Sequence, residues 1–121
     1  MSYKFYNANS RNNYVNDCVV RAISVAENKS WDETYEELSD MAQEQGILLD
    51  DVNFVEPLLD SRYPRACYND MLVGEFAETH PVGTYLITMH NHITCCINGV
   101  IYDTFDPRDK AMWCAWCVDT Y

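Results

Sequence analysis

Residues 17–27 read DCVVRAISVAE, and this stretch decides how the rest of the chain is arranged. Apolar side chains occupy nearly every side of the helix that it would form, and Arg21 is the only charge in its interior. A helix that is hydrophobic all round is buried all round. The stretch therefore predicts a central helix in a small domain, with Asn16 as a suitable N-cap residue.

The next segments also predict helices. Ser30 followed by Glu33 is the pattern of a capping box, and Gly46 provides an end for the helix that it begins. The apolar stripe of that helix consists of Trp31, Tyr35, Leu38 and Ala42. A third helix is expected over 51–62, shortened or kinked by Pro57. A short strand near 65–68 and a helical turn near 73–79 follow.

The periodicity then changes to that of strands. Residues 84–89 and 92–97 are rich in β-branched and aromatic residues, and Asn98-Gly99 between apolar runs is a strong hairpin signal. Residues 100–105 form the expected return strand, and 112–118 the last one. Helices followed by strands predict an α+β domain, in which a helical half packs on an antiparallel sheet.

Length and charge limit the possible functions. A chain of 121 residues is expected to form one domain over 1–121, with residues 1–15, which are polar and rich in Asn, as an irregular N-terminal arm. The formal net charge of −11 disfavours binding to nucleic acid or to an anionic membrane. It is compatible with a basic protein partner or substrate. The sequence does not indicate an oligomeric state.

The sequence predicts a cytoplasmic protein, because it has neither a signal-peptide run nor the roughly 20 apolar residues that span a bilayer. The six cysteines are then expected to be mostly reduced thiols. Cys114 and Cys117 form a single Cys-x-x-Cys pair, which is weak support for a metal or redox site because a structural zinc needs four ligands. We expect both to be strand residues, and no metal or cofactor.

Cys18 has the position of a nucleophile. It lies in the first turn of the expected central helix, where the helix dipole and unpaired N–H groups favour the thiolate form. The same N–H groups can stabilise an oxyanion. A cysteine in a buried helix is more often a small apolar residue, so the assignment depends on a base beside it.

The hairpin supplies that base. If Asn98-Gly99 is a two-residue turn, Ile97 pairs with Val100 and His92 with Phe105, so His92 and Asp103 are diagonal neighbours on one face. His90 would need a carboxylate further along, and Asp106 falls on the opposite face. The register therefore favours a triad in which Asp103 orients His92 and His92 activates Cys18.

The same segments resemble a known family. NDCVVRAIS, SWDETYEEL and GTYLITMHNHITCCINGVIYDTFD look like the corresponding parts of small bacterial and phage papain-like cysteine peptidases, over roughly residues 10–106. The resemblance implies a papain-like fold and carries Cys18, His92 and Asp103 over as the triad. The family has a Gln six residues before the cysteine as an oxyanion donor. That position is Asn12 here, and Asn16 is a nearer alternative.

The chain departs from the family pattern around the histidine, and two other functions are alternatives to a peptidase. Relatives often have Gly before the histidine, whereas this chain has Asn91, and His90 is a second candidate base. One rival is a non-catalytic acidic binding or inhibitor protein on the same fold, for example phage-encoded and directed at a host protein. The other is an acyl-transfer enzyme, such as a transglutaminase or a peptidoglycan amidase, that uses the same triad.

Overall fold

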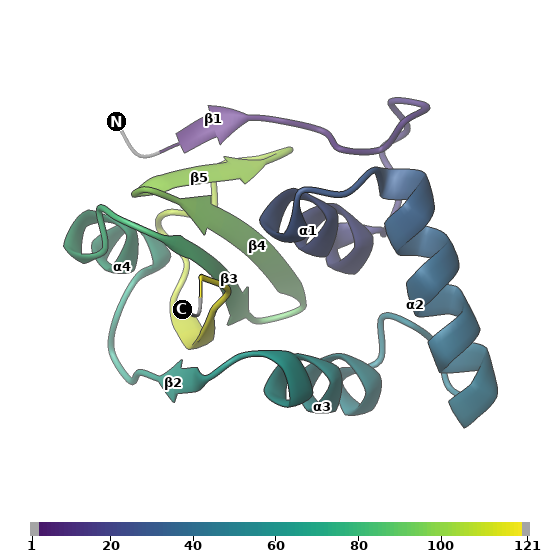
Figure 1. Cartoon of the computed structure of the whole chain (residues 1–121). Coiled ribbons are helices and arrows are strands. Elements are labelled where there is room, and N and C mark those ends of the chain that lie inside the picture. Colours follow the sequence, from purple (N-terminus) through teal and green to yellow (C-terminus); the bar gives the residue numbers. More distant parts are fainter. Residues whose placement is uncertain (1–2, 120–121) are drawn as a thin grey trace.

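Four helices and six strands make up residues 3–119, the part of the chain that the computed structural model describes (Figure 1). The helices are α1 (Cys18–Glu27), α2 (Trp31–Gln45), α3 (Val52–Arg62) and α4 (Val73–Thr79). The strands are β1 (Tyr3–Phe5), β2 (Arg65–Cys67), β3 (Thr84–Met89), β4 (His92–Ile97), β5 (Val100–Asp103) and β6 (Met112–Cys117). No helix within 3–119 is long and apolar enough to cross a membrane.

The strands form one sheet in the order β1-β5-β4-β3-β6-β2. The α+β class is as predicted, but the sheet is mixed and not purely antiparallel, because β1 pairs in parallel with β5. Residues 3–5 therefore belong to the sheet, and the prediction of an irregular arm over 1–15 is wrong for them. Three residues are too short for a periodic pattern, so this strand could not be predicted from the sequence.

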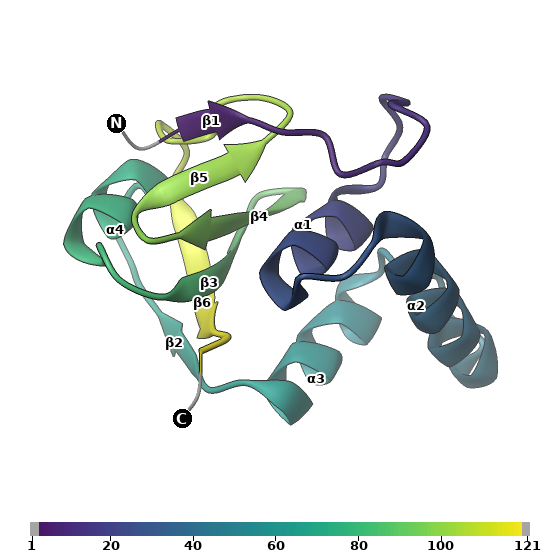
Figure 2. The same ribbon diagram turned by 45° about the horizontal axis from the view of Figure 1, so that its top comes forward.

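Each face of the sheet carries its own core. On one face, α1, α2 and α3 pack against Leu86, Cys95 and Trp116. On the other, α4 packs against side chains that include Ile87 and Ala115. Figures 1 and 2 show α1 and α4 on opposite sides of β3 and β4. The alternation of side chains along β3 and β6 thus builds three layers.

Helix α1 is central, as its composition predicts. None of its ten residues is exposed, and Val20 and Ile23 are buried completely or almost so. Its N-cap residue is Asp17 and not Asn16, so that prediction is wrong by one position. Cys18 is consequently the first residue of the helix.

The second and third helices follow the predicted boundaries closely. The capping box of Ser30 and Glu33 is present, and Gly46 ends α2 in the left-handed region. Tyr35, expected in the buried stripe, is exposed, and Thr34 is buried in its place. Pro57 lies within α3, which continues to Arg62.

The β4–β5 hairpin has the register that the sequence predicts. Ile97 pairs with Val100 across the turn, and both turn residues, Asn98 and Gly99, have positive φ. A Cβ atom at Gly99 would also lie 3.2 Å from a backbone oxygen of Ala77, so glycine is needed for close packing as well as for the turn. Strand β5 ends at Asp103, two residues earlier than expected.

Two of the six cysteines form a disulfide. Cys67 on β2 and Cys114 on β6 are direct cross-strand partners and are bonded to each other. Cys18, Cys95, Cys96 and Cys117 are free thiols. The expectation of mostly reduced cysteines therefore needs correction for this pair, which lies 47 residues apart in the sequence and has no local signal.

Candidate active site

Cys18 is the first residue of α1 and lies at the N-terminal end of the helix. Its side chain is partly buried, and the Asp17 side chain makes no capping hydrogen bond to the first turn. The N–H groups of a first helical turn have no partners within the helix. The cysteine therefore lies beside backbone donors that no side chain caps.

Strand β4 begins with His92, and β5 ends with Asp103. The His92 Nε2 atom lies 2.7 Å from an Asp103 carboxylate oxygen, and the two side chains are only 11% and 3% exposed. The Phe105 ring tilts against the imidazole at a centroid distance of 4.7 Å. Because Asp103 occupies Nε2, the ring nitrogen left for another partner is Nδ1.

The Cys18 thiol is a second polar neighbour of that ring. Burial alone would lower the pKa of His92. The hydrogen bond and charge of Asp103, together with the interaction with Cys18, outweigh burial and raise the pKa of His92 to about 9. The ring is therefore protonated at neutral pH, which suits a thiolate–imidazolium pair.

Asp103 is held as a carboxylate. Burial would raise its pKa, but the hydrogen bond and charge of His92 and the backbone N–H of Thr104 bring the pKa below its ordinary value. The Oδ1 atom accepts the Thr104 N–H at 2.7 Å and lies 3.3 Å from an Arg21 nitrogen. One carboxylate oxygen thus faces His92 and the other faces donors behind it.

Asp17 forms a second buried ion pair, with Arg21. Its carboxylate accepts hydrogen bonds from Arg21 Nε at 2.7 Å, Trp31 Nε1 at 3.0 Å and Asn9 Nδ2 at 3.1 Å. These donors come from α1, α2 and the N-terminal segment. They explain why the Asp17 side chain does not cap α1, and they give the buried Arg21 an ion-pair partner in the interior.

The two candidate oxyanion residues lie on the surface. Asn12 and Asn16 are exposed, and neither side chain makes a hydrogen bond within residues 3–119. Asn12 adopts a positive φ in the segment that precedes α1. The structure brings Cys18, His92 and Asp103 together, but it places neither asparagine in contact with them, so the oxyanion assignment stays a prediction.

The alternative base lies elsewhere. His90 is exposed in the turn between β3 and β4, beside the Asn91 amide and the edge of the Trp113 ring. Asp106, the other carboxylate considered, pairs with Arg108 at 2.6 Å. The hairpin register thus predicted which of the two histidines lies against Asp103.

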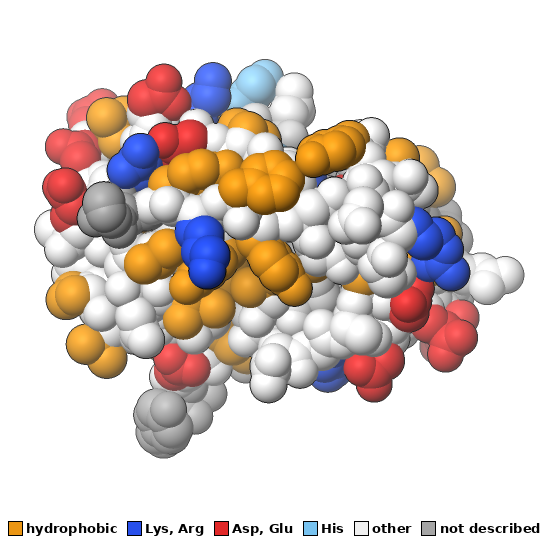
Figure 3. Space-filling model, turned by 90° about the horizontal axis from the view of Figure 1, so that it is seen from above, with side chains coloured by type: hydrophobic (Ala, Val, Ile, Leu, Met, Phe, Trp, Pro, Cys, Tyr) orange, Lys and Arg blue, Asp and Glu red, His pale blue; other side chains and the backbone are white. Residues whose placement is uncertain are grey.

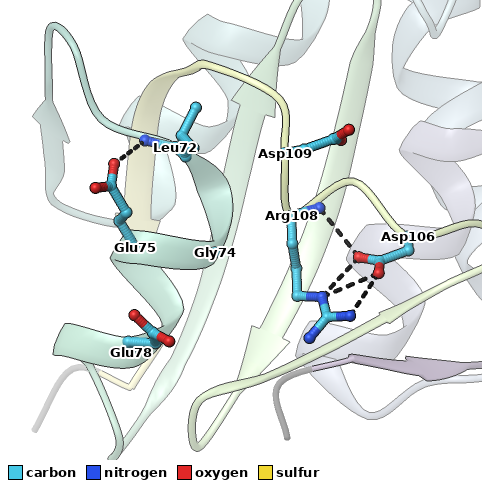
Figure 4. A pocket seen from close by; sticks show the side chains of 7 residues that line it. All are labelled: Leu72, Gly74, Glu75, Glu78, Asp106, Arg108 and Asp109. Carbon is cyan, nitrogen blue, oxygen red and sulfur yellow. Dashed lines mark hydrogen bonds and ion pairs between the residues drawn. The ribbon is translucent and has the colours of Figure 1, made fainter.

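A shallow hollow on the surface carries several acidic side chains. It is lined by Glu75, Glu78, Asp106 and Asp109 with Arg108, and includes none of the triad residues. Figure 4 shows the Glu75 carboxylate turned toward the Leu72 N–H and that of Asp106 toward Arg108. Within residues 3–119, no group of three or more acidic, His or Cys side chains could hold a metal ion.

The face around β1 is apolar at its centre. Seen from above, hydrophobic side chains gather across the middle of this face and acidic ones lie toward its margins (Figure 3). Phe5 and Tyr6 on this side of the sheet are about half exposed, at 52% and 48%. Tyr6 and Cys18 line the same small cavity, so apolar surface adjoins the cysteine.

Sequence reasoning missed the parts of the site that come from distant segments. Asn9 and Trp31 were not recognised as partners of Asp17. The spacing of Asp17 and Arg21, four residues apart in a helix, is a usable signal for their ion pair. Arg21 and Asp103 lie 82 residues apart, and only the folded structure brings them together.

Comparisons with known proteins identify no relative: no protein-family model, no curated protein and no solved structure matches this chain.

Proposed function

We propose that this protein is a cysteine-dependent hydrolase, a peptidase, isopeptidase or amidase, with Cys18 as nucleophile, His92 as base and Asp103 as the group that orients the histidine. The observation that carries the proposal is a buried imidazole that is hydrogen-bonded to Asp103 and has the thiol at the start of α1 as a neighbour. The class that we propose is papain-like, on the resemblance of the motifs and the order of the three residues. We also propose a cytoplasmic location.

The reaction would proceed through an acyl-enzyme. The Cys18 thiolate attacks the substrate carbonyl carbon, and the negative charge moves to the carbonyl oxygen. That oxygen is stabilised by the Cys18 N–H and by Asn12 or Asn16. The His92 imidazolium then protonates the leaving amine as the C–N bond breaks. His92 next deprotonates a water molecule, whose oxygen attacks the carbonyl carbon of the acyl-enzyme. The C–S bond then breaks, which releases the acid and restores the thiolate–imidazolium pair.

The charges around the ring support this assignment. A protonated histidine with a pKa of about 9 stabilises a neighbouring thiolate throughout the neutral range. Asp103 fixes the Nε2 side of the ring, so that Nδ1 is presented to Cys18. No cofactor is required for these steps.

The surroundings suit a protein or peptide substrate. Phe105 beside His92 and Tyr6 beside Cys18 are both partly exposed, which offers apolar contacts to a bound chain. The net charge of −11 favours substrates with basic residues and disfavours nucleic acid. We therefore propose a peptide-like substrate with apolar and basic side chains.

The test is labelling by a peptide-like electrophile, read by mass spectrometry. We expect the label on Cys18, and we expect Cys18→Ala and His92→Ala to abolish it. Cys117→Ala is the matched control, since Cys117 is also a partly buried free thiol. Labelling that survives both Cys18→Ala and His92→Ala would contradict the proposal.

A second candidate function is supported by the charge. A chain of net charge −11 is suited to hold a basic protein without any reaction. Equal reactivity of Cys18 and Cys117 would favour this acidic binding protein. A labelled Cys18 together with products that carry an added amine would instead favour acyl transfer over hydrolysis.

A further inference from the structure

Arg21 joins the two halves of the proposed site. Its Nε atom lies 2.7 Å from Asp17, and its Nη1 atom lies 3.3 Å from Asp103 and 3.0 Å from the Thr104 hydroxyl. The side chain is only 12% exposed. Asp17 immediately precedes Cys18, and Asp103 binds His92, so Arg21 links the residue before the cysteine to the carboxylate that holds the histidine.

We propose that Arg21 is a positioning residue of the reaction: by binding Asp17 and Asp103 at once, it sets where the His92–Asp103 pair lies relative to Cys18. The inference rests on the proposed function. Cys18 and Arg21 are three residues apart in α1, hence on the same side of the helix. The first turn of α1 therefore fixes the spacing of the two backbone positions, and the contacts with Asp17, Asp103 and Thr104 fix the guanidinium.

The guanidinium group suits this task better than another cation would. Its donors lie in one plane at fixed angles, so it can hold two carboxylates in a set geometry. Asp17 is itself fixed by Trp31 and Asn9. Arg21 thus connects Asp103 to an anchor that three separate segments hold in place.

The test compares Arg21→Lys with the matched control Arg62→Lys. Arg62 is also a partly buried arginine, 23% exposed, that binds two acidic residues, Glu27 and Glu37, without touching the proposed site. Lysine keeps the charge, but its single ammonium on a flexible stem cannot hold two partners in a fixed geometry. The readout is the rate at which a small neutral electrophile alkylates Cys18, measured as a function of pH.

Several charged and titratable groups around Asp103 can affect how the Cys18 alkylation rate depends on pH. They are His92 and Cys95 from β4, Cys18 and Arg21 from α1, and Tyr3 from β1. Only Arg21 changes in the variant. We expect Arg21→Lys to slow alkylation at pH 7 about tenfold and to move the acid limb of the profile to higher pH, since less thiolate is held by a misplaced imidazolium. Arg62→Lys should stay within about twofold of the unsubstituted protein at every pH.

Each outcome decides the inference. A normal rate in Arg21→Lys, or equal slowing in Arg62→Lys, would overturn it. If Arg21→Lys does not fold, Asp17→Asn removes the anchor and is expected to give the same slowing; if neither folds, Arg21 is a folding residue and the inference is wrong. A slow Cys18 in the unsubstituted protein would instead refute the proposed function itself.

Discussion

Two groups of charged side chains differ in how deeply they are buried, and this difference separates the proposed site from an ordinary charged surface. The buried charged cluster consists of Asp17, Arg21, His92 and Asp103, and its ion pairs are at most 12% exposed. The acidic hollow of Figure 4 has more carboxylates, but its ion pair of Asp106 with Arg108 is 39% exposed on both sides. Water screens the second group and not the first. Burial and shared partners, and not the number of acids, mark the proposed site.

The two groups also differ in how they shift the pKa values of their members. In the buried charged cluster, a histidine pKa rises to about 9 although burial opposes it. In the acidic hollow, the hydrogen bond from Arg108 lowers the pKa of Asp106, and the pair stays in solvent. Only the first arrangement holds a protonated base beside a thiol.

The largest expected difference between the two groups is in stability. Asp17→Ala removes a buried charge that accepts from Arg21 Nε and from two other interior donors, which should cost about 3–5 kcal/mol of unfolding free energy. Asp106→Ala removes an exposed ion pair and should cost less than about 1 kcal/mol. Urea unfolding of both variants measures this. Similar costs would show that the two groups are not distinct.

The pH dependence of stability sharpens the comparison next. The pKa of His92 is about 9 in the folded protein against an ordinary value of 6.5. Its contribution is therefore complete below about pH 6.5 and is lost as the pH rises through about 9. The pKa of Asp103 is lowered from 3.8. Its contribution to stability is therefore complete above about pH 3.8 and is lost as the pH falls through its lower folded-state pKa.

We therefore expect the stability advantage of the unsubstituted protein over His92→Gln to shrink between pH 7 and pH 10. Unfolding in urea at several pH values provides the measurement. His90→Gln is the matched control, because His90 lies exposed in the adjoining turn. A difference between the protein and His92→Gln that stays constant to pH 10 would rule out the raised histidine pKa.

The smallest expected effect concerns Phe105. Its ring shields one side of the imidazole at a centroid distance of 4.7 Å, and such aromatic contacts contribute about 0.5–1.5 kcal/mol. Phe105→Leu should lower the unfolding free energy by no more than this, while Tyr14→Leu, at a side chain that is 73% exposed, should change it less. Thermal unfolding can rank the two, and the reverse order would argue against a supporting role for Phe105.

The predictable parts of the fold depend on local pattern. The buried helix, the capping box of Ser30 and the turn at Asn98-Gly99 could all be read from neighbouring residues, and the turn fixed the partner of His92. The parallel pairing of Tyr3 with Ile101 and the Cys67–Cys114 bond could not be read, because they join segments distant in the sequence.

The candidate site divides in the same way. Cys18, His92 and Asp103 follow from the start of one helix and the register of one hairpin. The contact of Arg21 with Asp103 depends on how the helix docks on the sheet, which is a property of the packed core. Asn12 and Asn16 were chosen by spacing alone, and spacing does not determine the direction of a side chain in an irregular segment.

The most direct measurement is the alkylation rate of Cys18 relative to Cys117 at pH 7, with and without His92→Gln. If the imidazole holds Cys18 as a thiolate, Cys18 reacts at least about a hundredfold faster than Cys117, and His92→Gln removes most of that advantage. Equal rates in the unsubstituted protein, or a Cys18 rate that His92→Gln leaves unchanged, would contradict the account.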